Sequence, residues 1–304
     1  MNNGKVDWKG NFVALVTPFT KEGDVDEKKF IENIELLLSE GVHGVIVSGC
    51  TGESWSLESS EKERLYRIAV DTVKGRATVI AGTGGIVTRS VVALSKGAKE
   101  AGVDGVLILP PYYAMINEKE VIAHYRAISD EARVPILLYN IPRRTGVNLT
   151  PELCEELAEL DYVVAIKESS NDFVQVEATL AALGDRMLVF TGHSAVRGVA
   201  AVLLGCQGYV SSMESQVMGR GAIPLYELAA SGKVDEARKM QMRTLQLDQA
   251  MHKVGTFPAN LKAAMNILGR PGGYARAPIL GLNEADVERV RSVLNGLDLL
   301  ATAV

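Results

Sequence analysis

Short apolar runs alternate with amphipathic stretches from the start of the chain to about residue 230, and this alternation limits the fold more than any other feature. Each run is apolar on both faces, which is typical of a parallel strand covered by helices. The runs span residues 12–19, 44–49, 78–84, 105–110, 135–142, 163–169, 187–193 and 208–212. Eight strand–helix units at similar spacing predict a closed (β/α)8 barrel rather than an open doubly wound sheet.

The last part of the chain follows a different pattern. Three amphipathic stretches, 233–253, 257–269 and 283–297, follow one another with no strand-like run between them. No Gly-Ser linker or block of charge separates them from the preceding residues. We therefore predict a catalytic barrel over residues 1–230 and a C-terminal helical appendage over residues 231–304, packed together as a single structural unit.

The composition excludes several classes of function. With 47% hydrophobic and 23% charged residues, the 304-residue chain has the balance of a globular protein with a large core. A net charge of −5 leaves no basic footprint for nucleic acid, and the longest apolar runs are too short to span a membrane. The opening residues MNNGKVDWKG lack the apolar core of a signal peptide. We therefore expect a cytoplasmic protein that binds neither nucleic acid nor membrane.

Cysteine and histidine usage argues against a disulfide framework and a catalytic metal. Cys50, Cys154 and Cys206 lie far apart in the sequence and are odd in number. The four histidines form no HxxxH or HxH pair. We expect a reduced protein without a metal, although a site built from carboxylates alone stays open.

Lys167 is the least ordinary residue at the strand ends, where the reacting groups of a (β/α)8 barrel lie. It directly follows the apolar run Val163–Ile166. If its side chain extends into the barrel mouth, loss of hydration lowers its pKa and leaves an amine that can form a Schiff base with a ketone. The alternative is a lysine paired with Glu168 or another carboxylate at the rim.

Three further motifs at strand ends have the chemistry to handle a substrate. The loop GCTGES (49–54) can hold a carboxylate through backbone N–H groups and the Thr51 hydroxyl, although most such loops are tight turns. Tyr139 can shuttle a proton, or it can be a hydrogen-bonded wall residue. In the turn IPRRTG, one arginine can bind a substrate carboxylate. We expect Arg144 to bind the carboxylate, and we expect Arg143 to be an ordinary surface residue.

The chain resembles the dihydrodipicolinate synthase/N-acetylneuraminate lyase family over essentially its whole length. The resemblance implies a (β/α)8 barrel with a C-terminal helical extension, and a lyase of the class I aldolase type. It implies a homotetramer arranged as a dimer of dimers, and no cofactor, since the reaction uses a covalent lysine Schiff base. The motifs that carry it, in the family's order and spacing, are GCTGES (49–54), GTG (82–84), PPYY (110–113), YNIPRRTG (139–146) and IKES (166–169).

The resemblance also implies roles for individual residues. Lys167 matches the lysine that forms the Schiff base with pyruvate or another 2-oxo acid, and Tyr139 matches the tyrosine that transfers protons. Tyr113 matches a tyrosine that reaches the active site of a neighbouring subunit. The remaining matches bind substrate: Thr51 the carboxylate of the 2-oxo acid, Gly192 and Val210 the surroundings of the lysine, and Arg144 the carboxylate of aspartate semialdehyde.

Arg144 favours 4-hydroxy-tetrahydrodipicolinate synthase, which condenses pyruvate with the aldehyde of aspartate semialdehyde, because N-acetylneuraminate lyases typically lack this arginine. Two departures leave alternatives open. Cys50 stands where synthases usually have a threonine that relays protons, and a thiol is a weaker hydrogen-bond partner. His193 stands where acidic residues are common, so it either contacts a substrate hydroxyl or carboxylate or bonds to backbone at the rim.

Three other functions remain as alternatives. The first is a catabolic relative: a 2-keto-3-deoxy sugar acid aldolase or dehydratase, or a hydroxypyrroline-carboxylate deaminase. The second is a non-catalytic protein that binds a 2-oxo acid, against which the presence of both Lys167 and Tyr139 argues. The third is a phosphate-binding barrel isomerase, but GYVSS (208–212) lacks an evident glycine-rich phosphate cup.

Overall fold

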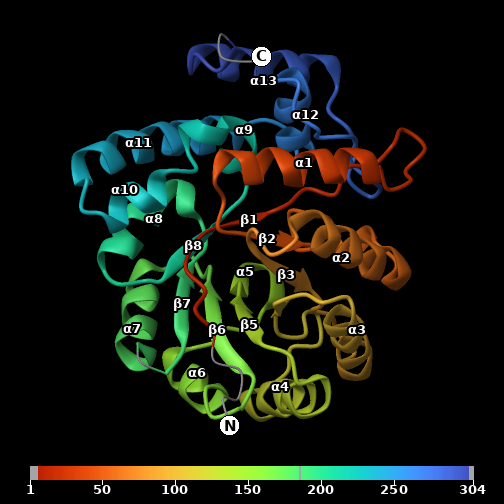
Figure 1. Ribbon diagram of the computed structural model, residues 1–304, viewed down its shortest axis with the longest axis vertical. Coiled ribbons are helices and arrows are strands. Elements are labelled where there is room, and N and C mark those ends of the chain that lie inside the picture. The colour runs from red at the N-terminus through yellow and green to blue at the C-terminus, as the bar shows by residue number, and fades with distance from the viewer. Residues whose placement is uncertain (1–5, 185, 301–304) are drawn as a thin grey trace.

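The computed structural model describes residues 6–184 and 186–300 and forms a closed parallel barrel. The strands pair in sequence order, and β8 closes the barrel against β1 (Figure 1). They are β1 (Gly10–Ala14), β2 (Gly44–Val47), β3 (Thr78–Gly82), β4 (Gly105–Ile108), β5 (Ile136–Asn140), β6 (Val163–Glu168), β7 (Leu188–Thr191) and β8 (Gly208–Ser211). The predicted (β/α)8 barrel is confirmed. The predicted units 1–230 and 231–304 both include residues outside the described ranges. The opening stretch MNNGKVDWKG also begins outside them.

Helices surround the barrel, and none of those described is long and apolar enough to cross a lipid bilayer. Two single-turn 3-10 helices also occur, at Ser54–Ser56 and Gly219–Gly221. The α-helices are α1 (Glu27–Glu40), α2 (Ser59–Val73), α3 (Thr88–Glu100), α4 (Glu118–Ala132), α5 (Pro142–Thr145), α6 (Pro151–Leu157), α7 (Phe173–Leu183), α8 (Ser194–Leu203), α9 (Met213–Met218), α10 (Leu225–Ala230), α11 (Val234–Met251), α12 (Ala259–Ile267) and α13 (Glu284–Gly296).

The first strand is shorter than its apolar run. The run 12–19 predicts a strand to Phe19, but β1 ends at Ala14. The later apolar residues are buried for another reason: Leu15 and Phe19 pack in the main core, and Val16 packs against the C-terminal helices. Burial therefore continues past the point where strand pairing stops.

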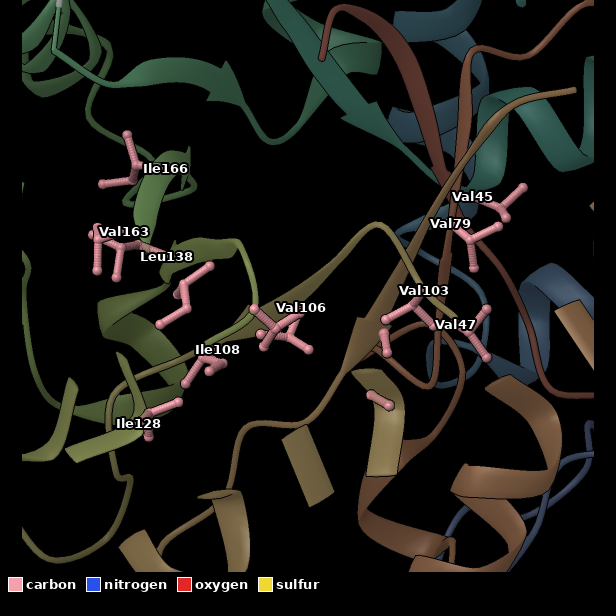
Figure 2. Packing of buried hydrophobic residues seen from close by; sticks show 14 of the residues in the cluster. Val45, Val47, Val79, Val103, Val106, Ile108, Ile128, Leu138, Val163 and Ile166 are labelled. Atoms are coloured by element: carbon pink, nitrogen blue, oxygen red, sulfur yellow. The ribbon is translucent and has the colours of Figure 1, made fainter. Parts of the chain in front are cut away.

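Side chains of each strand alternate between two apolar layers. In β2, Ile46 points into the barrel interior, whereas Val45 and Val47 join the layer between strands and helices. Figure 2 shows this outer layer, in which Val79, Ile108 and other branched side chains from neighbouring strands pack together. Because both faces of each strand are covered, the runs are continuously apolar in the sequence.

The C-terminal helices pack on the barrel through a second apolar cluster. This cluster joins Val16 and Met213, near the barrel rim, to Leu247 of α11 and Leu261 of α12. Helix α11 contacts α8, and α12 contacts both α9 and α13. In Figure 1 the blue helices α12 and α13 lie at one end of the molecule. The helices after residue 233 are as predicted, while the division at residue 230 stays a prediction.

A buried ion pair ties α12 to the loop after β2. Lys262 is only 2% exposed, and its Nζ donates to a Glu53 carboxylate oxygen and to the carbonyls of Thr17 (2.6 Å) and Tyr274 (2.7 Å). The second carboxylate oxygen of Glu53 accepts the backbone N–H of Arg276 at 3.1 Å. All three ammonium donors thus have acceptors, which buried charges need in order to be tolerated.

The variant Lys262→Met is expected to lower the free energy of unfolding by about 3–5 kcal/mol, because it leaves the Glu53 carboxylate buried without its counter-charge. Urea denaturation followed by circular dichroism measures this change. Adding Glu53→Gln should recover part of the loss. The control, Lys28→Met, removes an exposed pair with Glu32 and should leave stability nearly unchanged. Equal stability of the Lys262 and Lys28 variants would contradict this account.

Candidate active site

A cavity of about 580 Å³ opens where the carboxyl ends of the strands meet. Loops after β2, β5, β6, β7 and β8 contribute to its walls, together with residues of the C-terminal helices. Most of the predicted site residues come together here although they lie far apart in the sequence. Those that line the cavity are Cys50, Thr51, Tyr139, Arg144, Lys167, His193 and Val210.

Gly192 does not line the cavity, contrary to prediction. Its carbonyl accepts the Nε–H of Arg197 at 3.3 Å, and a Cβ at this position would lie 1.9 Å from Ser169 Oγ. A side chain here would collide with the end of β6, so glycine is needed for close packing rather than for lining.

Tyr113 also lies outside the cavity of its own chain. It follows β4 in an exposed loop, and 90% of its surface is accessible. Its place in a neighbouring subunit's site, which the resemblance implies, stays a prediction.

Strand register directs Lys167 into the barrel. In the parallel ladder it pairs with Tyr139 of β5 and Phe190 of β7. Ala165, two residues earlier, belongs to the apolar interior, and residues two apart in a strand share a face. Lys167 is 8% exposed, and its Nζ lies 4.0 Å from the centroid of the Tyr139 ring.

Burial lowers the pKa of Lys167 to about 8. The positive charges of Arg143 and Arg144 lower it too, whereas Cys50 and Glu214 oppose the shift. Within the described residues, the Lys167 ammonium makes no hydrogen bond or ion pair. At pH 7 roughly a tenth of such amines are neutral, several hundred times the fraction for an unperturbed lysine.

Glu168 lies next to Lys167 but does not pair with it. One Glu168 oxygen accepts from the side-chain amides of Asn140 (2.6 Å) and Gln175 (3.0 Å), and the other accepts the backbone N–H of Ser170 (2.5 Å). The alternative in which Lys167 is neutralised by Glu168 is therefore wrong. Successive strand residues point to opposite faces, which keeps this carboxylate out of the cavity.

Tyr139 faces the lysine as a protonated phenol. Burial raises the pKa of Tyr139 well above its usual value, and the nearby Cys50 raises it further. Both residues line the cavity, and a proton relay through Cys50 stays a prediction. The phenol can give a proton to an alkoxide formed above it.

The loop GCTGES forms a pocket of free backbone donors. Glu53 N–H donates to Cys50 O at 3.1 Å and Ser54 N–H donates to Gly49 O at 3.2 Å, which closes the turn. In the described structure the N–H groups of Thr51 and Gly52 have no such partner, and Thr51 lines the cavity. Free N–H groups in a turn suit a carboxylate.

Both arginines of the turn line the cavity, so Arg143 is not the plain surface residue that we expected. Its guanidinium donates to Nε2 of His193 at 3.1 Å. Burial lowers the pKa of His193 to about 3, and Arg143 contributes, so His193 is neutral at physiological pH. Arg144 instead lies over the Trp55 ring at 5.8 Å.

Sequence reasoning missed a group of wall residues, most of them polar. Glu214 lines the cavity, receives a hydrogen bond from the Ser194 hydroxyl, and has a pKa raised by burial. It lies close after β8, so the rule that places active sites at strand ends could have found it. The C-terminal helices and their connecting loop supply the others, which no pattern in the sequence marks: Asp248, His252, Phe257 and Asn260.

A family model described as the Dihydrodipicolinate synthetase family matches residues 7–297. The chain belongs to this family. It is 36% identical to an "uncharacterized DapA-like lyase" of Rhizobium meliloti, with 97% of this chain and 98% of the relative covered. It is 34% identical to a 4-hydroxy-tetrahydrodipicolinate synthase of Geotalea daltonii, with 96% and 100% covered. It is therefore an enzyme of the lyase class.

A solved structure supports the same relationship. The crystal structure of YagE from Escherichia coli K12, determined in complex with pyruvate, has a TM-score of 0.91 at 28% identity and covers 96% of this chain and 99% of its own. Among the residues that the structure describes, no group of three or more His, Cys, Asp or Glu side chains is suited to a metal. The expectation that the enzyme uses no cofactor stays a prediction.

The neutral fraction of Lys167 should rise with pH through a midpoint of about 8, since burial favours the uncharged amine. Trace labelling with acetic anhydride, read by mass spectrometry, follows each lysine without assuming a substrate. Arg144→Gln should move the midpoint upward by removing a positive charge, whereas Arg67→Gln, on the exposed face of α2, should not. A midpoint for Lys167 near about 10.4 contradicts a desolvated amine.

Proposed function

We propose that this enzyme forms a Schiff base between Lys167 and pyruvate or a related 2-oxo acid. One observation carries the proposal: Lys167 is a buried amine with a lowered pKa and no ion-pair partner, and it faces the cavity. A structural lysine in this position would need a counter-charge. The free donors at Thr51 supply a place for the 2-oxo acid's carboxylate, as the resemblance implies.

The proposed reaction follows from these groups. The neutral amine attacks the keto carbon, and loss of water gives an iminium ion. The iminium withdraws electrons, so a methyl proton passes to water and an enamine forms. The enamine carbon then attacks an aldehyde, and the Tyr139 phenol gives its proton to the new alkoxide.

The particular reaction that we propose is the one catalysed by 4-hydroxy-tetrahydrodipicolinate synthase. Arg144 lines the cavity and can bind the carboxylate of aspartate semialdehyde bidentately. Relatives with that name, such as the Geotalea protein, match nearly the whole chain and support this choice.

A catabolic relative that cleaves or dehydrates a larger 2-oxo acid is the second candidate. The observation that favours it is the polar far wall, where Glu214, Asp248 and His193 can bond to substrate hydroxyls. A homotetramer in the cytoplasm is our proposal for the assembly and location of either enzyme. The exposed Tyr113 is consistent with a subunit contact.

Borohydride reduction in the presence of pyruvate is expected to add the mass of one reduced pyruvate adduct to Lys167. Peptide mass spectrometry locates the adduct. Lys167→Ala should gain none, while Lys28→Ala, which removes an exposed lysine, should react like the parent. Tyr139→Phe should still form the adduct but lose about 10²–10⁴-fold in turnover, because its proton donor is gone. If the parent gains no adduct at Lys167, the Schiff-base function is excluded.

A substrate screen separates the two candidates. Pyruvate with aspartate semialdehyde is compared with 2-keto-3-deoxy sugar acids and hydroxypyrroline carboxylate. Turnover of the semialdehyde far above the other compounds, with a large rise in KM in Arg144→Gln, is the result expected for the synthase. Faster turnover of a sugar acid or the pyrroline would instead identify the catabolic enzyme.

A further inference from the structure

One side of the cavity contains two buried polar groups that lack partners. Arg197 is 9% exposed and Ser169 is 1% exposed, and both line the cavity. Within the described structure, neither Arg197 Nη2 nor Ser169 Oγ has a hydrogen-bond partner. A buried polar group without a partner costs about 1–3 kcal/mol, and more when it is charged. Two such groups beside a substrate cavity indicate that a bound ligand supplies the missing hydrogen-bond partners.

The neighbours of Arg197 do not satisfy it. Its Nε donates to the carbonyl of Gly192, and its guanidinium lies 6.0 Å from the Phe173 ring centroid. Glu168 and Asp172 act on it electrostatically, yet neither bonds to it. Glu168 is held by side-chain amides and a backbone N–H, and an oxygen of Asp172 caps α7.

The arrangement suits an acid group. Arg197 lies in the first turn of α8, whose N-terminus carries partial positive charge. A guanidinium, a hydroxyl and a helix N-terminus all favour a carboxylate. Ser169 is two residues beyond Lys167, a separation of roughly 7 Å along an extended chain. A carboxylate a few carbons from the reacting ketone would therefore reach this position.

This position is distinct from the one at Arg144. Arg144 lies over Trp55, which follows β2, whereas Arg197 lies near Phe173, which follows β6. The two arginines themselves follow β5 and β7, one on each side of the strand that carries Lys167.

We propose that Arg197 and Ser169 bind the second acid group of a dicarboxylic 2-oxo acid whose ketone reacts with Lys167. The inference rests on the proposed Schiff-base function, and it favours the second candidate, an enzyme for a larger 2-oxo acid, over the synthase. Gly192 contributes to this binding site, because any side chain at that position would displace Ser169.

The test compares acids with their neutral esters. Borohydride trapping at Lys167 is measured against concentration for 2-oxoglutarate and 2-oxoadipate, and for the ester of each with a methyl group on the far carboxylate. The parent should reach half-saturation at least about tenfold lower with an acid than with its ester, as a charge-assisted hydrogen bond allows. Arg197→Gln should bring the ratio of the two half-saturation concentrations, ester over acid, close to one. Arg197→Lys should keep this ratio part of the way above one. Arg67→Gln, a matched change on the exposed face of α2, should leave the ratio as in the parent.

Two outcomes overturn the proposal. A parent ratio near one, or a ratio that survives Arg197→Gln, means that the two groups hold only water. If Arg144→Gln brings the ratio to one and Arg197→Gln does not, the second acid group binds at Arg144. If Arg197→Gln does not fold, Ser169→Ala provides the same test and should also reduce the ratio.

Pyruvate in the same trapping series separates this inference from the proposed function. Adducts with pyruvate but no preference for the diacids reject the acid position alone. No adduct with any 2-oxo acid rejects the Schiff base. In that case, calorimetry with glutarate, which has no ketone, tests the acid position directly. Binding by the parent that Arg197→Gln loses supports it, and equal or absent binding rejects it.

Discussion

The rest of the site depends on the burial of the Lys167 amine away from water. Burial disfavours the ammonium, and the pKa of Lys167 stays lowered only while no carboxylate pairs with it. The adjacent Glu168 could supply that charge, but strand alternation sends it to the other face. A slip of one residue in the β6 register would exchange the two side chains and place a carboxylate in the barrel mouth. Register is therefore as important to the chemistry as the lysine itself.

The C-terminal helices take part in the site in two ways. They supply one wall of the cavity, including Asp248 and Asn260. They also hold the GCTGES loop, because Lys262 of α12 bonds to Glu53, a residue in the left-handed backbone region (φ 53°) that side chains adopt at some cost. An anchor at Glu53 fixes the turn that presents Thr51 to the cavity. A boundary at residue 230 therefore describes the order of elements along the chain but does not divide the function.

The sequence predicts the barrel and the central pair Lys167 and Tyr139 because both follow from local rules. Apolar runs alternate visibly with amphipathic stretches along the sequence, and parallel strands all end at one face. The role of Gly192 could not be predicted in this way, because a glycine needed for packing and one that lines a pocket look alike until Ser169 is placed beside it. Asp248 was equally inaccessible, since it reaches the cavity only through the docking of α11, which depends on tertiary packing.

Schiff-base chemistry does not by itself select a substrate, because it engages only the ketone and its neighbouring carbons. Selection depends on the charges that meet the remainder of the molecule. Burial raises the pKa of Glu214 and of Asp248, which reduces the negative charge that these walls present. The guanidinium groups of Arg144, over Trp55, and of Arg197, near Phe173, remain positive. A substrate with one carboxylate near the ketone and a second one further along relieves more uncompensated charge than a polyol would. The electrostatics of the cavity therefore favour diacids, and the side toward which the second acid turns decides which arginine binds it.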